Sequence, residues 1–332
     1  MEHLLGLPPE ASKHAAELDS LNAVVHWLMA ILFVGWGLFF LYTIFRFRAS
    51  RNPRADYAGV KSHVSSYLEV AVALVEIVLL VGFSIPLWAH RASPEDFPAA
   101  KDSIVVKVMA EQFAWNIHYP GPDGIFGKQD IKLVSSDNPM GLDKNDPNGK
   151  DDVISVNQLH VVLNKPVIIH LTSKDVIHSF ALQQMRVKHD AIPGSNFPIW
   201  FIPTKTSTEI QEEMTTVVST KAAGFGASHV AMEEYKAADG TVIVKKGQIV
   251  TEKEAVGALL KLKPSLTEKL SAAGINQIRI APETPTEITC AQLCGLGHFK
   301  MRGYYTVETQ EEFDKWMKEK AAAGGGGGTS YE

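Results

Sequence analysis

Two long apolar segments near the start of the chain constrain its fold more than any other feature. Residues 20–45 contain no Lys, Arg, Asp or Glu, and residues 62–90 carry only Glu69 and Glu76 as charged side chains. About 20 apolar residues in a helix span the hydrocarbon core of a bilayer. A helix of a soluble protein rarely stays apolar on all faces over such a length. The sequence therefore predicts two membrane helices, at about 20–45 and 64–90, and the alternative is a pair of helices buried in a soluble core.

The charges that flank these segments predict their orientation. The loop between them is rich in arginine, whereas residues 1–19 carry one basic residue, Lys13, among several acidic ones. Loops rich in Lys and Arg stay on the cytoplasmic side of a membrane. We therefore expect an external N-terminal lead-in at 1–19, a transmembrane helical hairpin at 20–92, and the rest of the chain on the periplasmic side of a bacterial plasma (inner) membrane.

The chain beyond residue 97 has the pattern of a β domain. Short runs of β-branched and aromatic residues alternate with turn signals, which is typical of an all-β sandwich or barrel. Acidic and basic residues are nearly balanced there, which argues against a nucleic-acid partner. The expected strands are Ile104–Tyr119, Leu159–Leu163, Val167–Thr172, Ser179–Val187, Phe197–Ile202, Thr286–Ile288 and Tyr304–Val307.

A segment at about 208–280 interrupts this succession of short strands. Its Asp239-Gly240 dipeptide predicts a hairpin, and a helical stretch follows near 252–272, which Pro264 is expected to break. We interpret the segment as an α+β insertion between two strands of the external domain.

The end of the chain predicts one helix and a flexible tail. Thr309-x-x-Glu312 is a capping box, which predicts a final helix to about Ala322. The external domain is therefore expected to cover residues 97–322. The glycine-rich residues 323–332 predict a flexible tail.

The only two cysteines of the chain share one short segment with a histidine and a methionine. The segment reads Cys290-Ala-Gln-Leu-Cys294-Gly-Leu-Gly-His298-Phe-Lys-Met301. Two thiolates, one imidazole and one thioether form a soft ligand set, which favours copper, zinc or an iron–sulfur cluster over magnesium or calcium. Two copper ions bridged by both thiolates would use all four side chains. Such a centre indicates electron transfer rather than acid–base chemistry.

A bridged copper pair needs a second imidazole, which this segment lacks. His178, in Lys174-Asp-Val-Ile-His-Ser-Phe180, lies among apolar residues where a strand is expected to begin, and it could supply that ligand. Two alternatives remain open. A single zinc ion could bind the two cysteines and two histidines, which would leave Met301 without a role. A disulfide between the cysteines would leave both His298 and Met301 without one.

At these residues the chain resembles subunit II of cytochrome c oxidase, a family of the haem–copper oxygen reductases. The resemblance implies a two-helix transmembrane hairpin and an external cupredoxin-like β-sandwich with Greek key topology, carrying the binuclear copper centre called copper A. The segments that carry it, besides the hairpin, are Gln112-Phe-Ala-Trp-Asn-Ile-His-Tyr-Pro120, Ser173-Lys-Asp-Val-Ile-His-Ser-Phe180, Asp190-Ala-Ile-Pro-Gly194, Phe201-Ile-Pro-Thr-Lys205 and the cysteine segment through Gly303.

The resemblance also implies which residues bind the copper ions. Where many members have a glutamate that also binds a magnesium ion shared with subunit I, this chain has Gln292. A neutral amide is a weaker ligand for a hard cation, so that magnesium ion is not assigned to this chain. The implied copper ligands are His178 and Met301 for one ion, His298 and the backbone carbonyl of Gln292 for the other, and Cys290 and Cys294 as bridges.

Aromatic and acidic residues complete the implied electron and proton routes. Many members have two tryptophans where electrons arrive; here Phe113 takes the first position and Trp115 the second. Glu69, in Leu68-Glu69-Val70, matches the glutamate at the mouth of the K proton channel, although its carboxylate could instead simply reach the membrane interface. Glu76 has no family counterpart. It lies on the same helix face, about 10 Å deeper, and would extend a hydrogen-bonded path or bond to subunit I.

These observations predict a subunit of the enzyme cytochrome-c oxidase, an aerobic terminal oxidase. It would accept electrons from cytochrome c or a similar haem donor at copper A and pass them to haem in subunit I, where O2 is reduced to water with proton translocation. The expected partners are subunit I, other oxidase subunits, membrane lipid and an electron-donor complex bound through the insertion. The acidic loop Asp143–Asp152 is a candidate donor-docking site or a merely solvated loop. The alternatives are the copper A subunit of a nitric oxide reductase and a structural membrane subunit without copper.

Overall fold

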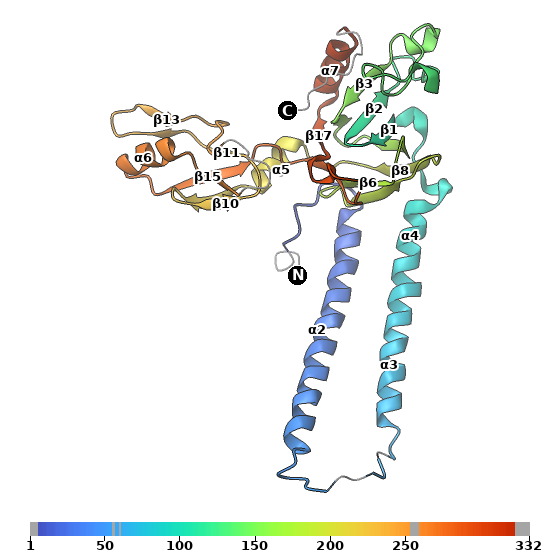
Figure 1. Cartoon of the computed structure of the whole chain (residues 1–332), viewed down its shortest axis with the longest axis vertical. Coiled ribbons are helices and arrows are strands. Elements are labelled where there is room, and N and C mark those ends of the chain that lie inside the picture. Colours follow the sequence, from blue (N-terminus) through green and yellow to red (C-terminus); the bar gives the residue numbers. More distant parts are fainter. Residues whose placement is uncertain (1–5, 55–56, 60, 253–258, 323–332) are drawn as a thin grey trace. The chain divides into compact units, whose positions relative to one another are not determined.

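The computed structural model describes residues 6–54, 57–59, 61–252 and 259–322 (Figure 1). Two compact units can be distinguished. One holds the apolar helices within residues 15–97, and the other holds residues 8–14 together with the chain from Pro98 onward.

The two apolar segments form helices that are long and apolar enough to cross a membrane. The first is α2 (Ala15–Arg46), which begins earlier than the predicted residue 20. The second runs from Val64 to Ala92. It consists of α3 (Val64–Leu79), a π-helical turn η1 (Leu80–Ser84) and α4 (Ile85–Ala92).

The π-helical turn has a local cause in the sequence. Pro86 has no backbone N–H, so the carbonyl group of Gly82 loses its regular helical donor. The backbone widens just before this proline, and the Ser84 hydroxyl donates a hydrogen bond to the Leu79 carbonyl at 3.2 Å. The helix thereby continues through the proline instead of ending there.

The external unit is built on two five-stranded sheets. In the first sheet the strand order is β3 (Val153–Val156), β2 (Ala114–Tyr119), β1 (Ile104–Glu111), β5 (Val167–Ser173) and β8 (Phe197–Phe201). In the second it is β4 (Gln158–Val162), β17 (Arg302–Glu308), β16 (Glu287–Cys290), β6 (His178–Leu182) and β7 (Val187–Ala191).

One hydrophobic core joins the two sheets. Strand β1 alternates buried and half-buried residues, so that Val106 and Val108 point inward. They belong to the same buried cluster as Ile169 of β5, Phe180 of β6 and Tyr305 of β17. The predicted β-sandwich is therefore confirmed. Strands β1 and β5 pair in parallel, as do β4 and β17, whereas the other pairs in these sheets are antiparallel.

Two expected strands are in fact pairs of strands. The segment Ile104–Tyr119 turns back on itself at Gln112 and Phe113, so that β1 and β2 form a hairpin. The segment Ser179–Val187 likewise turns between β6 and β7, where Arg186 has a φ of 52°. Neither turn contains Gly, Pro, Asn or Asp, the residues by which turns are usually recognised in a sequence.

The segment before the first helix packs on the sandwich. The N–H of Ala11 donates to the Gln184 carbonyl, and the N–H of Thr204 donates to the Ala11 carbonyl, both at 2.8 Å. Ala11 is fully buried in the sandwich core. The predicted lead-in at 1–19 is thus divided between this packed segment and the first turns of α2; residues 1–5 lie outside the described part.

The loop between β2 and β3 buries one of its acidic residues. The Asp152 carboxylate accepts hydrogen bonds from His118 Nε2 at 2.6 Å, from the N–H of Gly127 at 2.8 Å and from the N–H of Gly121 at 3.1 Å. His118 and Asp152 have no exposed side-chain surface. The acidic loop Asp143–Asp152 therefore does not present Asp152 to a docking partner, which corrects that part of the expectation.

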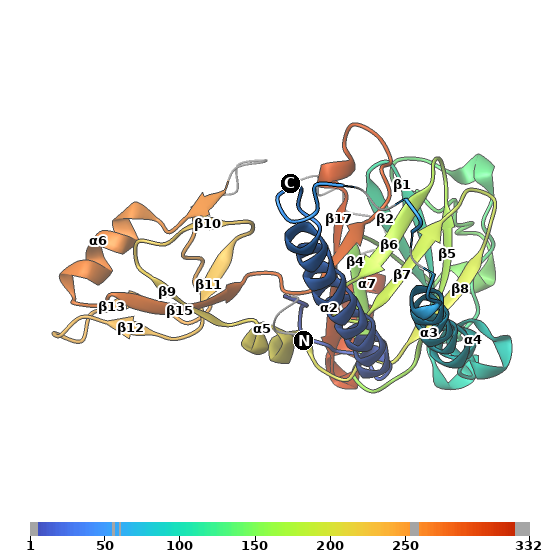
Figure 2. The same ribbon diagram turned by 90° about the horizontal axis from the view of Figure 1, so that it is seen from below.

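Between β8 and β16 the chain forms a substructure with its own core. The elements after α5 (Ser207–Glu213) are β9 (Thr216–Ser219), β10 (Ala223–Phe225), β11 (His229–Ala231), β12 (Tyr235–Lys236), β13 (Val242–Val244), β14 (Leu260–Lys261), α6 (Pro264–Ala272) and β15 (Gln277–Pro282). Strand β15 lies between β9 and β11 (Figure 2). Its buried cluster, which includes Leu270 and Ile280, shares no residue with the sandwich core.

Two expectations for this segment can be compared with the structure. The hairpin at Asp239-Gly240 is confirmed, because β12 and β13 pair on either side of it. The effect of Pro264 was predicted wrongly: it stands in the first turn of α6 instead of breaking a helix. A proline fits there because the first helical N–H groups have no partner within the helix. Residues 253–258 of the predicted helical stretch lie outside the described residues.

The final helix, α7 (Gln310–Ala322), begins as predicted. The N–H of Glu312 donates to the Thr309 hydroxyl, and the N–H of Thr309 donates to the Glu312 carboxylate, so the capping box is confirmed. The Trp316 ring stacks on His160 of β4, with 4.0 Å between ring centroids. The predicted tail at 323–332 lies outside the described residues. Short 3-10 turns occur at Pro94–Asp96, Ala100–Asp102, Ile131–Leu133, Pro147–Gly149 and His298–Lys300.

Candidate metal centre

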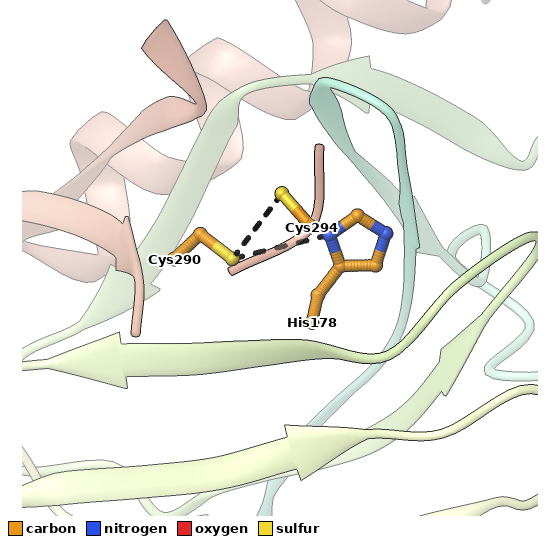
Figure 3. Close-up of side chains that lie close together, drawn as sticks. All are labelled: His178, Cys290 and Cys294. Atoms are coloured by element: carbon orange, nitrogen blue, oxygen red, sulfur yellow. Dashed lines mark hydrogen bonds between the residues drawn. The ribbon is translucent and has the colours of Figure 1, made fainter. Parts of the chain in front are cut away.

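Two neighbouring strands bring the predicted metal ligands together. His178 opens β6 and Cys290 closes β16, and these strands pair so that Cys290 lies opposite Phe180. The loop from β16 to β17 carries the remaining ligand candidates. Figure 3 shows the side chains of His178, Cys290 and Cys294 pointing toward one another. Among the described residues, these three form the only group of His, Cys, Asp or Glu side chains placed to share a metal ion.

The donor atoms form a continuous cluster. Cys290 Sγ lies 3.9 Å from Cys294 Sγ and 3.9 Å from His178 Nδ1. Cys294 Sγ lies 3.4 Å from His298 Nδ1 and 3.7 Å from Met301 Sδ. The carbonyl oxygen of Gln292 lies 3.1 Å from Cys290 Sγ. The structure therefore brings together all six ligands implied by the sequence.

The distance between the two cysteine sulfur atoms excludes a disulfide bond and fits two thiolates that share a metal ion. A disulfide bond is about 2.05 Å long, so these two free cysteines are not joined. Two thiolates on one metal ion, each at about 2.3 Å, lie at most about 4.6 Å apart. The observed 3.9 Å fits shared coordination. Met301 Sδ lies against Cys294, which favours a centre that uses the thioether over a zinc site that does not.

The two thiol groups differ in how readily they ionise. Burial opposes ionisation of Cys290, but hydrogen bonds, first among them that with His178, lower its pKa to about 6. Burial and the neighbouring Cys290 raise the pKa of Cys294 to about 11. Without a metal ion the chain thus favours one thiolate next to one thiol. A bound metal ion deprotonates a coordinating thiol outright.

A carboxylate outside the predicted ligand set holds His178. The Asp175 carboxylate lies 2.8 Å from His178 Nε2, the ring nitrogen that faces away from the cysteines. Asp175 also accepts a hydrogen bond from the N–H of Gln112 at 2.7 Å. A carboxylate on the second ring nitrogen fixes the orientation and tautomer of a metal-binding histidine. Sequence reasoning missed Asp175, although an acidic residue three positions before the histidine was an available signal.

The hairpin turn between β1 and β2 supports the cysteine loop. Gln112 Nε2 donates to the Cys294 carbonyl at 2.5 Å. The Phe113 ring lies against Gly297, where a Cβ atom would come within 2.4 Å of the ring. Gly295 has a φ of 134°, a conformation that other residues rarely adopt. The loop can therefore approach Phe113 this closely only because glycine stands at both positions.

The two predicted aromatic residues have different environments. Trp115 is fully buried, and its ring meets the rings of Phe180 and His178 at centroid distances of 5.2 Å and 6.2 Å. Phe113 is half-buried at the cysteine loop. Phe113 is therefore accessible at the cysteine loop, whereas Trp115 is buried next to His178.

The cysteine loop also exposes three large apolar side chains. Leu296 is 98% exposed, Leu293 78% and Phe299 58%. They alternate with the predicted ligands Cys294 and His298 in the sequence. We call these three residues the apolar rim. Exposed apolar side chains grouped at a functional site are typical of a binding surface.

Glu69 and Glu76 do not belong to this cluster. Both lie in α3, in the other compact unit, and their side chains are exposed. Neither carboxylate has a hydrogen-bond or ion-pair partner within the described part of the chain.

Comparison with known proteins identifies relatives of the sandwich. A family model described as "Cytochrome C oxidase subunit II, periplasmic domain" matches residues 104–210. The alternative cytochrome c oxidase subunit 2 of Bradyrhizobium diazoefficiens is 32% identical over 191 residues, which are 57% of this chain and 66% of that protein. The cytochrome c oxidase subunit 2 of Cereibacter sphaeroides is 28% identical over 211 residues, 59% of this chain and 66% of that protein.

The matches have limited extent. The aligned parts cover just under two thirds of each of these two relatives. A solved structure of the periplasmic domain of subunit II of cytochrome oxidase of Bradyrhizobium japonicum aligns with 69% of this chain and 99% of that chain, with 19% identity and a TM-score of 0.33. The family model ends at residue 210, before the first strand of the substructure β9–β15.

Proposed function

The chain belongs to the cytochrome c oxidase subunit II family, and from this membership we propose that it is the electron-accepting subunit of an aerobic terminal oxidase. It takes electrons from cytochrome c or a similar haem donor at a binuclear copper centre. It delivers them to haem in subunit I, where O2 is reduced to water with proton translocation. The observation that carries the proposal is the cluster of soft ligands around the two sulfur atoms, 3.9 Å apart.

The residues present fit a pair of copper ions. Two thiolates, two imidazoles, a thioether and a carbonyl oxygen match the soft, mixed ligand set that copper prefers. When bound, such a pair takes up and releases single electrons. The proposed ligands are Cys290 and Cys294 as bridges, His178 and Met301 for one ion, and His298 with the Gln292 carbonyl for the other.

The chain itself keeps the ligand positions fixed. Asp175 orients His178, and the side chain of Gln112 holds the Cys294 carbonyl. Both ligand strands belong to a sheet that closes over a buried core. A rigid ligand frame suits electron transfer, because little rearrangement is then needed when the charge of the centre changes.

The apolar rim is the proposed contact for the electron donor, together with Phe113. Leu293, Leu296 and Phe299 belong to the ligand loop and offer apolar surface to an apolar haem edge, and the Lys300 ammonium lies 5.7 Å from the centroid of the Phe299 ring. A small contact of this kind suits a short-lived complex. The acids of the loop Asp143–Asp152 are less available: besides Asp152, Asp146 accepts a hydrogen bond from the N–H of Lys128.

The membrane placement follows from the flanking charges. We propose that α2 and the helix Val64–Ala92 cross a bacterial plasma membrane, with the arginine-rich loop in the cytoplasm and the copper domain on the periplasmic side. Glu69, near the cytoplasmic start of α3, would then receive protons at the mouth of a channel in subunit I. The substructure β9–β15 is a candidate contact for other oxidase subunits or for a donor complex.

Stopped-flow mixing of the purified oxidase complex with reduced cytochrome c tests the function. The wild-type complex is expected to oxidise the cytochrome in a rapid phase, and Cys294→Ser, which removes a bridging sulfur, is expected to abolish that phase. Leu296→Ser should slow it, whereas Ile131→Ser, which changes an 86% exposed apolar residue outside the rim and outside the substructure β9–β15, should not. An unchanged rapid phase in Cys294→Ser would contradict the proposal.

A further inference from the structure

The two apolar helices enclose a groove at their outer ends, which are periplasmic in the placement proposed above. The groove has a volume of about 700 Å³, within the range of about 300–1,000 Å³ that is typical of ligand sites. Its walls come from the first turns of α2 and the last turns of the second helix, all within one compact unit. Most of the lining is apolar, with Leu21 and Val24 on α2 and Phe83 and Leu87 on the second helix.

The π-helical turn η1 makes room in one wall of this groove. Gly82 of the turn and Pro86, just after it, both line the groove. Among the described residues, an added Cβ atom at Gly82 would come within 4 Å of one side-chain atom, Val78 Cγ1 at 3.9 Å. The glycine therefore leaves space that a larger side chain would fill. Such wide turns are frequent at functional sites.

Polar side chains stand at the outer end of the groove. Glu17 and Ser20 lie in the first turns of α2, and His90 lies in the last turn of α4. The Glu17 carboxylate is close enough to the Arg91 guanidinium for the two charges to interact. His90 Nδ1 lies 3.3 Å from the Asp96 carboxylate. This end of the groove thus offers a negative and a positive charge, whereas the remaining lining is apolar.

The groove has the length of one lipid leaflet. From Leu79 to His90, which both line it, the second helix rises by about 16 Å. Half of a hydrocarbon core of about 30 Å is about 15 Å. A molecule that fills the groove therefore combines an apolar chain of this length with a charged group at one end.

We propose that this groove binds one phospholipid of the outer leaflet, whose zwitterionic headgroup carries an ammonium group. An acyl chain lies along Leu21 and Phe83 and passes Gly82. The headgroup ammonium donates to the Glu17 carboxylate, and the phosphate faces Arg91. A quinone has an apolar chain but no charged group for these two residues. The inference uses the membrane placement proposed above and does not depend on the copper centre.

Photo-labelling of the complete complex tests the site. The probe is phosphatidylethanolamine with a diazirine in one acyl chain, and loosely held lipid is exchanged for detergent before irradiation. Adducts are expected within residues 79–87. Gly82→Leu, which fills the groove, should abolish them. Gly35→Leu should not, because Gly35 lies in α2 outside the groove, and an added Cβ atom there meets no heavy atom of the described residues within 4 Å.

Two results of this labelling would overturn the proposal. One is equal labelling of residues 79–87 in Gly82→Leu and the wild type. The other is a wild type without adducts there, which would mean that another occupant, such as a helix of a neighbouring subunit, fills the groove.

The headgroup is tested by a variant that leaves the groove open. A hydrogen bond between charged groups contributes about tenfold or more to binding. Glu17→Gln should therefore retain about tenfold less of the probe, whereas Glu95→Gln, which changes an exposed acid beyond the end of α4, should retain the wild-type amount. The same probe with a phosphatidylglycerol headgroup, which has no ammonium group, should label the wild type about tenfold less.

Equal retention by Glu17→Gln and the wild type, or equal labelling by the two lipids, would overturn the assignment of an ammonium group to Glu17. A quinone instead of a phospholipid in the organic extract of the washed complex would overturn the assignment of the ligand.

The copper content of the same preparations separates this inference from the proposed function. A complex that contains copper but carries no adducts in the groove overturns only the lipid site. A complex with adducts in the groove but without copper contradicts only the proposed electron-accepting function.

Discussion

His178 depends on a side chain that is not itself a metal ligand. The Asp175 carboxylate at 2.8 Å from Nε2 leaves Nδ1 directed at Cys290. Carboxylates in this position usually contribute a factor of about 10–100 to metal affinity, because they fix the ring before the metal binds.

We therefore predict that Asp175→Ala lowers copper affinity by about 10–100-fold while the protein remains folded. Competitive titration of the purified protein with a copper chelator measures this affinity. Asp137→Ala is the matched control, because Asp137 is an exposed acid of the loop between β2 and β3. Equal affinities for the two variants would show that Asp175 does not position His178.

A second residue-scale prediction concerns stability in acid. Burial alone would raise the pKa of Asp152, but hydrogen bonds from His118, Gly127 and Gly121 outweigh it and lower this pKa. The carboxylate therefore stabilises the fold at pH values above its unfolded pKa of about 3.9, and this stabilisation is lost as the pH falls through the folded pKa.

Asp152→Asn removes the charge from this buried pair. We expect it to lower the free energy of unfolding at neutral pH by about 3 kcal/mol. The loss of stability below about pH 4 should also become shallower than in the wild type. Unfolding curves recorded over a pH series measure both effects, with Asp137→Asn as control. A variant with the wild-type pH dependence would contradict this account of Asp152.

At the residue scale, the sequence indicates the candidate ligands but not the residues that support them. Cys290, Cys294, His298 and Met301 are close in the sequence, so ligand chemistry alone indicates them. Gln112 reaches the Cys294 carbonyl across 182 residues of chain. Such a contact depends on how the strands pair. The residue types and their spacing in the sequence do not determine this pairing.

Among the structural elements, the loop between β16 and β17 and the β1–β2 hairpin act as one unit. Gly297→Ala would place a Cβ atom 2.4 Å from the Phe113 ring. We expect the loop to shift, with His298 displaced and the copper content of the purified protein reduced. Atomic absorption of the purified variant measures that copper content.

A double variant identifies the cause of this effect. Gly297→Ala combined with Phe113→Ala removes the ring that the new methyl group would meet, so copper content should recover. Gly226→Ala is the control, because a Cβ atom there meets no heavy atom within 4 Å. Failure of the double variant to recover copper would mean that Phe113 is not the obstacle.

Secondary-structure elements could be predicted from the sequence where a turn or cap contains a characteristic residue. They were missed where a turn contains none. The capping box at Thr309 and the Asp239-Gly240 hairpin carry residues with a local mechanism, and both were predicted. The hairpin turn at Gln112 and Phe113 has no such residue, so β1 and β2 were predicted as one strand. The position of that turn is set by sheet packing, since Trp115 faces the sandwich core.

At the scale of the whole molecule, the hydrophobic core of the substructure β9–β15 is separate from the core of the sandwich. The cluster around Leu270 shares no residue with the sandwich cluster, and Gln211 of α5 donates a hydrogen bond to the Pro282 carbonyl at 2.8 Å. The segment between Gln211 and Pro282 therefore begins and ends at two points that lie close together.

Replacement of residues 216–282 by a short Gly-Ser linker should then preserve the copper centre. We expect unchanged copper content, because no ligand and no residue of the sandwich core is removed. A slower oxidation of the physiological donor, with cytochrome c oxidation unchanged, would identify the segment as a donor contact. Loss of copper on deletion would contradict the separation of the two cores.

We propose that this chain binds two copper ions that share one unpaired electron. Copper quantitation combined with electron paramagnetic resonance of the purified oxidised protein tests it most directly. We predict two copper ions per chain and a spectrum in which one electron couples to both nuclei, which Cys290→Ser should abolish. One copper ion with coupling to a single nucleus, or zinc in place of copper, would contradict the account.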